Sequence, residues 1–93
     1  MSKGVALGFV ETRGNSGGII AIDAMLKTAD VEFVKRVEIG GGFVTVIIRG
    51  EVGAVRSSVE AGAEEAARIG ELVSTNIIPS AHADVFQLIG VKK

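Results

Sequence analysis

Catalysis needs acidic, basic or nucleophilic side chains that can converge, and this chain offers few of them. His82 is its only histidine, and the chain has no cysteine. A zinc site built on one histidine without cysteine would need several carboxylates around it. His82 follows Pro79-Ser80-Ala81 at an expected helix start, which suits it to capping or to contact with a neighbour better than to general-base work. We expect no catalytic residue, no metal and no cofactor, so an enzyme is not predicted.

A second candidate is the stretch Gly14-Asn15-Ser16-Gly17-Gly18, which lies between an expected strand and an expected helix. Phosphate-binding loops occupy this place in many folds, because helix N-termini attract anions. The stretch lacks the Lys-Ser/Thr pair of a P-loop, and its glycine spacing is not the dinucleotide-binding pattern. We interpret it as a helix entry with close backbone packing, in which Asn15 or Ser16 caps the helix. Phosphate binding is the alternative.

A third candidate is the run Gly40, Gly41 and Gly42, named here the glycine turn. Three consecutive glycines cost backbone entropy, and a hairpin usually needs only one or two residues with positive φ. The run is therefore either a slack turn or a place where backbones approach a ligand or each other. In a cyclic ring, identical loops meet at the axis. Glycines there would leave an opening lined by N–H and C=O groups, as in many pores.

Hydrophobic patterning predicts the elements that position these loops. Strands are expected at Val5–Glu11, Val31–Ile39, Phe43–Arg49 and Leu72–Ile78, and helices at Ile19–Ala29, Glu51–Ile69 and His82–Ile89. The order is β-α-β-β-α-β with a terminal helix. It predicts an α/β (α+β) fold of the split β-α-β type, a four-stranded antiparallel sheet with helices on one face.

The same patterning predicts which side chains are buried. In the strand 31–39, alternation places four apolar residues on one side, which are Val31, Phe33, Val37 and Ile39. In the first helix the apolar face is expected to hold Ile19, Ile22, Leu26 and Ala29. The second helix is expected to gain weak support from the pairs Arg56–Glu60 and Glu64–Arg68, four residues apart, and to end at Gly70.

Composition excludes several functions and favours an oligomer. The 93 residues predict a single domain, 1–93. A net charge of −1 and the lack of Tyr and Trp argue against nucleic-acid binding. No apolar run approaches a membrane span, and no signal peptide is recognised, so the cytoplasm is expected. Apolar residues make up 47% of the chain, which is high for a small monomer and indicates surface meant for other subunits.

Several segments, in order and over nearly the whole chain, resemble the shell proteins of bacterial microcompartments. They are Ala6 to Gly14, Asp23 to Ala29, Gly40 to Val46, Arg49 to Val55, Arg68 to Ser74, Ile78-Pro79 and His82. The resemblance implies a flat homohexamer that tiles with other shell proteins into facets around a set of enzymes. Those enzymes dock in this family through targeting helices. The chain is thus expected in a cytoplasmic microcompartment shell.

The resemblance also implies roles for single residues. Gly41 is expected at the narrowest point of a central pore that passes small metabolites, and its type is most similar to ethanolamine-utilisation shell proteins. Glu38 and Ile39 are expected to flank the pore. The contacts between hexamers are expected at the edge, at residues Lys27, Asp30, Ser80 and His82.

Two departures from the family carry information. Ser80 stands where the family usually has an arginine that reaches into the next hexamer, so weaker tiling is expected, because a hydroxyl replaces guanidinium pairing poorly. Glu38 stands where many relatives have lysine. A ring of carboxylates would favour cations or neutral solutes, unless Lys35 or Arg36 offsets it. The rival hypotheses are a small metabolite- or nucleotide-binding regulatory domain and a small isomerase or lyase that uses His82.

Overall fold

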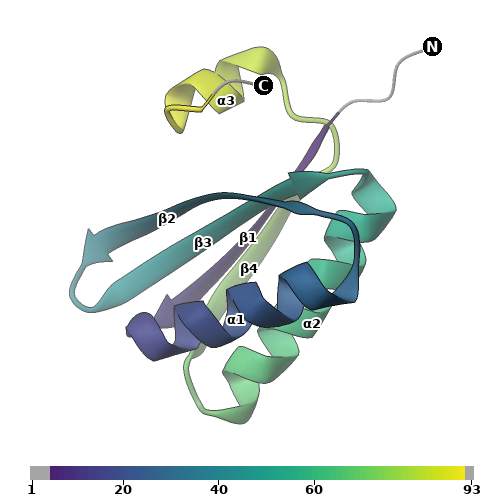
Figure 1. The fold of residues 1–93 in the computed structure, drawn as a ribbon. Coiled ribbons are helices and arrows are strands. Elements are labelled where there is room, and N and C mark those ends of the chain that lie inside the picture. The colour runs from purple at the N-terminus through teal and green to yellow at the C-terminus, as the bar shows by residue number, and fades with distance from the viewer. Residues whose placement is uncertain (1–4, 92–93) are drawn as a thin grey trace.

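One antiparallel sheet of four strands separates two layers of helices. In the computed structural model, which describes residues 5–91, the sheet has the order β2-β3-β1-β4. Its strands are β1 (Ala6–Arg13), β2 (Glu32–Gly40), β3 (Phe43–Gly50) and β4 (Leu72–Ile78), and the helices are α1 (Asn15–Thr28), α2 (Val52–Arg68) and α3 (Ala83–Leu88). The long helices α1 and α2 lie on one face, and α3 lies on the other (Figure 1). The predicted split β-α-β fold is confirmed, with the terminal helix set apart from the other two.

Each face of the sheet carries its own core. The larger core lies between the sheet and the two long helices and is built from buried residues that include Val10, Met25, Val46, Ile48 and Val55. The smaller core lies under α3 and contains Leu7, Ile47, Ala81 and Phe86. Strand β3 contributes to both cores, so its near-continuous apolar sequence is explained by burial on two sides.

Two glycines allow the larger core to close. A Cβ atom on Gly8 of β1 would lie 2.5 Å from Cγ2 of Val59 and 2.8 Å from Cγ1 of Val55. A Cβ atom on Gly62 of α2 would lie 2.7 Å from Cγ of Met25. Glycine at these positions therefore lets α2 approach both the sheet and α1 more closely than any larger residue would.

Helix α1 begins earlier than predicted and turns a different side to the core. Its N-cap is Gly14, with φ of 87° and no side-chain cap, so the predicted cap at Asn15 or Ser16 is wrong. The buried residues are Gly17, Gly18, Ala21 and Met25, whereas Ile19 is 56% and Leu26 is 45% exposed. Small residues face inward because the helix lies tightly on the sheet: a Cβ on Gly17 would be 3.0 Å from Cβ of Thr12 in β1. The predicted close packing is confirmed.

Strand β2 departs from the simple alternation that its sequence predicts. Its register against β3 shifts between Phe33 and Lys35 and again between Glu38 and Gly40. An extra residue in one strand moves all later side chains to the opposite face. Phe33 precedes the first shift and stays on the helix-covered side, where it is 48% exposed at the sheet edge, and Ile39 is 55% exposed. Val34 and Val37 pack against the smaller core on the opposite face. The predicted apolar side of this strand is wrong for that reason.

Helix α2 ends as predicted, but its ion pairs differ. Gly70, with φ of 73°, donates its N–H to the carbonyl of Ala67, and Glu71 donates to Ala66, both at 2.9 Å. This is the Schellman arrangement that favours glycine. Arg68 pairs with Glu65 at 2.8 Å rather than with Glu64, and Arg56 and Glu60 form no ion pair within residues 5–91. Among those residues no helix is long and apolar enough to cross a membrane.

Candidate functional site

The glycine turn forms the tip of the β2–β3 hairpin. Gly40 pairs with Phe43, so Gly41 and Gly42 are the two central residues. The φ angles of Gly40, Gly41 and Gly42 are 88°, 65° and 83°, all in the left-handed region that L side chains rarely adopt. Positive φ at both central residues is what a type I′ hairpin turn requires. The run is thus not a slack turn, because each of its three glycines is needed by the backbone.

Space does not limit the glycine turn. A Cβ on Gly40 or Gly42 would meet nothing within 4 Å, and one on Gly41 would meet only the ring of Phe43, at 3.5 Å. All three glycines are exposed. Backbone conformation alone therefore explains the glycines within one chain, and the tip presents backbone without side chains to its surroundings.

The tip is held by the junction between β1 and α1. The N–H of Gly14 donates to the carbonyl of Gly42 at 2.6 Å. The hydroxyl of the fully buried Thr12 lies 3.2 Å from the carbonyl of Gly14 and 3.4 Å from that of Val44. These contacts fix the hairpin tip against the start of α1. The sequence does not reveal this role of Gly14, whose only signal is its place between an expected strand and an expected helix.

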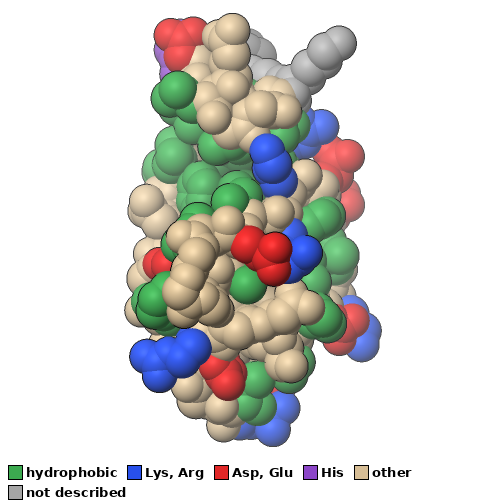
Figure 2. All heavy atoms as spheres, turned by 90° about the vertical axis from the view of Figure 1, so that its left-hand side faces the viewer, with side chains coloured by type: hydrophobic (Ala, Val, Ile, Leu, Met, Phe, Trp, Pro, Cys, Tyr) green, Lys and Arg blue, Asp and Glu red, His purple; other side chains and the backbone are tan. Residues whose placement is uncertain are grey.

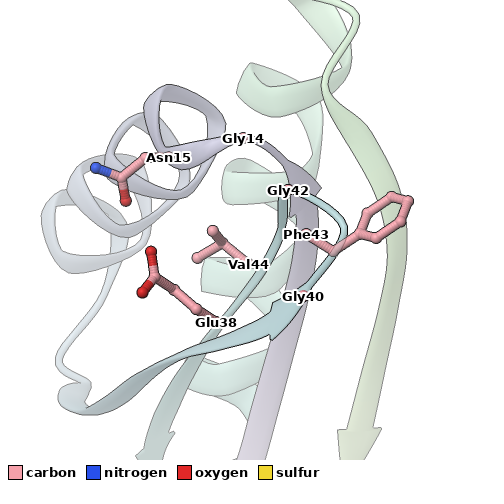
Figure 3. A pocket seen from close by; sticks show the side chains of 7 residues that line it. All are labelled: Gly14, Asn15, Glu38, Gly40, Gly42, Phe43 and Val44. Atoms are coloured by element: carbon pink, nitrogen blue, oxygen red, sulfur yellow. The ribbon is translucent and has the colours of Figure 1, made fainter.

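A hollow of about 350 Å³ lies beside the turn, between the hairpin and the start of α1. In Figure 3, the side chains of Glu38 and Asn15 point into it from β2 and α1, and Phe43 points away. Its full lining is Gly14, Asn15, Glu38, Gly40, Gly42, Phe43 and Val44. Glu38 thus lines this hollow, and Ile39 is exposed beside it; that the two residues flank a pore stays a prediction.

The charge of Glu38 is balanced within the same chain. Nη1 of Arg36 lies 3.4 Å from Oε1 of Glu38 and donates to Oδ1 of Asn15 at 2.8 Å. Lys35 lies on the other face and donates instead to the carbonyl of Ile89, at 3.1 Å. Charged side chains of both signs also lie next to each other on this end of the molecule (Figure 2). Arg36, not Lys35, therefore offsets the carboxylate that the sequence placed near the turn.

The four residues expected at a hexamer edge do not lie at the glycine turn. Lys27 and Asp30 come at or after the end of α1, which runs away from the turn, and Ser80 follows the far end of β4 (Figure 1). Lys27 pairs with Asp23 at 2.9 Å. Nδ1 of His82 accepts the N–H of Asp84 at 3.1 Å and so caps α3. The capping interpretation of His82 is thereby confirmed, and its edge role stays a prediction.

Comparison with known proteins decides the family. The family model described as the BMC domain matches residues 6–81. The chain belongs to the BMC domain family. This BMC domain is 47% identical to a carboxysome shell protein of Hydrogenovibrio crunogenus over 91 residues, which cover 97% of this chain and 94% of the relative. It is 48% identical to the bacterial microcompartment shell protein PduA of Salmonella typhimurium over 84 residues, or 90% and 89% of the two chains.

Solved structures agree with the sequence relatives. The BMC domain superposes on the crystal structure of a microcompartment protein from Desulfitobacterium hafniense with a TM-score of 0.82 and 37% identity. The match covers 94% of this chain but 49% of that one, so the chain spans about half the length of the Desulfitobacterium protein. Within residues 5–91, no group of three or more His, Cys, Asp or Glu residues is placed to hold a metal ion.

Proposed function

We propose that this protein is a structural shell subunit of a bacterial microcompartment. Its copies form a cyclic hexamer with the glycine turn at the axis, and small metabolites pass through the opening. The observation that carries the proposal is the glycine turn itself, in which three consecutive exposed residues have positive φ in a chain of the BMC domain family. In this role the protein is not a catalyst: it forms part of the shell and the pore through it.

Passage through the pore is passive, with a barrier set by the radius of the opening and by the dipoles and charges along it. Gly41 stands at the narrowest point, where six copies contribute backbone groups and no side chains. Because each Glu38 has Arg36 at 3.4 Å, the flank adds little net charge to the ring. The pore therefore selects by size and polarity more than by charge, in place of the acidic opening that Glu38 alone would create.

The outer end of each subunit serves assembly. Lys27, Asp30, Ser80 and His82 meet neighbouring hexamers or other shell proteins of the same compartment. Lys27 and Asp23 are 75% and 60% exposed at their side chains, so their ion pair is weak and the lysine can exchange partners on assembly. Encapsulated enzymes are further partners, and they dock through their own targeting helices.

Two measurements test the proposal. Sedimentation of the purified protein is expected to show a hexamer, and a stable monomer at all concentrations would overturn it. In reconstituted shells, Gly41→Leu is expected to reduce the passage of a small neutral solute. Gly41→Ala is the matched control, because it has the same backbone strain with little added volume. Equal passage in both variants and the parent would remove the pore role of Gly41.

A further inference from the structure

The two free edges of the sheet differ in shape. Strand β2 forms one edge and carries Phe33, a large aromatic side chain that is 48% exposed. Strand β4 forms the other edge, and a hollow of about 380 Å³ lies between it and α2. Its lining is Arg56, Val59, Glu60, Ala63, Thr75 and Ile77. One edge therefore carries an apolar protrusion and the other an unfilled, partly apolar recess.

The register of the sheet places the protrusion and the recess at the same level. Phe33 pairs with Ile48, Ile48 with Gly8, and Gly8 with Ile77. Residues that pair across antiparallel strands point to the same face, so Phe33 and Ile77 lie on the helix-covered side at opposite ends of one row. The recess lies at this row, because Val59, which lines it, packs directly against Gly8.

Rotation about an axis leaves the distance of every atom from that axis unchanged, so in a ring only positions at equal distance can meet. If the glycine turn lies at the axis, the strands run outward and the residues of one row lie at roughly similar distances from the axis. We propose that Phe33 of one copy inserts into the recess at Val59, Ala63 and Ile77 of the next copy around the ring. This inference rests on the proposed hexamer and names the contact that closes it, a head-to-tail contact as cyclic rings require.

Charges on the two edges support the same partner. Arg36 pairs with Val46, Val46 with Val10, and Val10 with Thr75, so Arg36 lies level with Thr75, two rows nearer the glycine turn than Phe33. Helix α2 runs toward that end, which places Glu60 nearer to it than Arg56 (Figure 1). The row of Arg36 thus meets Glu60 of the next copy. A guanidinium has five N–H donors, so Arg36 can keep Asn15 and Glu38 as well.

The edge of β2 is unsuited to the other way of joining subunits, which is to extend the sheet. Its register shifts at two places, one directly after Phe33 and one after Glu38. Such bulges interrupt the row of backbone donors and acceptors that a neighbouring strand would need. The contact between copies is therefore made by side chains, with Phe33 as its largest apolar member on this edge.

A double-mutant cycle tests the inference. Phe33→Ala removes the protrusion, Ala63→Phe fills the recess, and the double variant moves the protrusion to the other side of the interface. Each single variant is expected to raise the subunit concentration at half-assembly, measured by sedimentation velocity, by about ten-fold. The double variant is expected to assemble about ten-fold better than either single one. A melting curve of each dilute variant checks that it folds. Phe33→Ala is expected to fold, because Phe33 is 48% exposed in the single chain.

The cycle separates contacts within a chain from contacts between chains. In one chain Phe33 and the recess lie three strand spacings apart, roughly 14 Å, so effects of the two substitutions on folding should add. Ala67→Phe is the matched control, since Ala67 is exposed one turn along α2 and does not line the recess, and it should not rescue Phe33→Ala. If the parent is a hexamer but the effects of Phe33→Ala and Ala63→Phe on assembly simply add, this contact is wrong while the hexamer is not. Equal rescue of Phe33→Ala by Ala67→Phe would lead to the same conclusion. A monomeric parent would overturn the proposed function itself.

Discussion

Replacing Gly42 by alanine should destabilise the protein through backbone strain alone. The φ angle of Gly42 is 83°, and an added Cβ would meet nothing within 4 Å. No steric clash contributes, so the expected cost is that of a non-glycine residue in the left-handed region, roughly 1–2 kcal/mol. Each kcal/mol lowers the melting temperature of a domain of this size by about 4–8 °C.

Gly42→Asn is the matched comparison, because asparagine adopts the left-handed region several times more readily than most residues. It should lose about half as much stability as Gly42→Ala. Both variants and the parent are melted at one fixed subunit concentration, followed by circular dichroism, so that assembly contributes equally. If Gly42→Ala melts with the parent, or if asparagine is as harmful as alanine, the left-handed geometry of the turn is refuted.

Two further predictions concern charge and assembly. Arg36→Gln leaves Glu38 without its 3.4 Å partner, so a small cation should pass reconstituted shells faster than an anion of equal size, an advantage that fades above about 0.1 M salt. The fold should be unaffected, because exposed ion pairs contribute at most about 1 kcal/mol, and unchanged cation preference would show that Glu38 is not at the pore. Ser80→Arg should enlarge the sheets seen by electron microscopy, whereas Ser80→Lys should not, since lysine lacks the planar donor pair of arginine; equal sheets in all three proteins would count against this edge.

The sequence predicted the order and type of every strand and helix, but not the phase of two of them. A prediction from hydrophobic periodicity assumes that successive residues of a strand alternate regularly between its two faces. The register shift after Phe33 breaks this alternation, and no residue type in the sequence marks it. In α1, Ile19 and Leu26 suggest the buried face, yet Gly17 and Gly18 are buried instead. The helix lies so close to the sheet that only small residues fit between them. In both elements, apolar side chains that the pattern predicts to be buried are exposed on the single chain.

The candidate site was predictable where composition was unusual and hidden where the contacts are made by backbone. Three adjacent glycines mark the turn in any reading of the chain. The hydrogen bond from Gly14 to Gly42 joins two segments far apart in sequence through groups that every residue has, so no pattern predicts it. The neutralisation of Glu38 lies between these cases, since Arg36 was a candidate partner that only the geometry could select over Lys35.

The left-handed backbone of the glycine turn also limits how this opening can change by mutation. At Gly40, Gly41 and Gly42, almost any single substitution brings strain before it brings new chemistry. Residues beside the turn, such as Glu38, Ile39 and Asn15, have no positive φ and can vary without that penalty. Natural or designed substitutions should therefore alter permeability first at these neighbouring residues, while the backbone of the glycine turn keeps its shape.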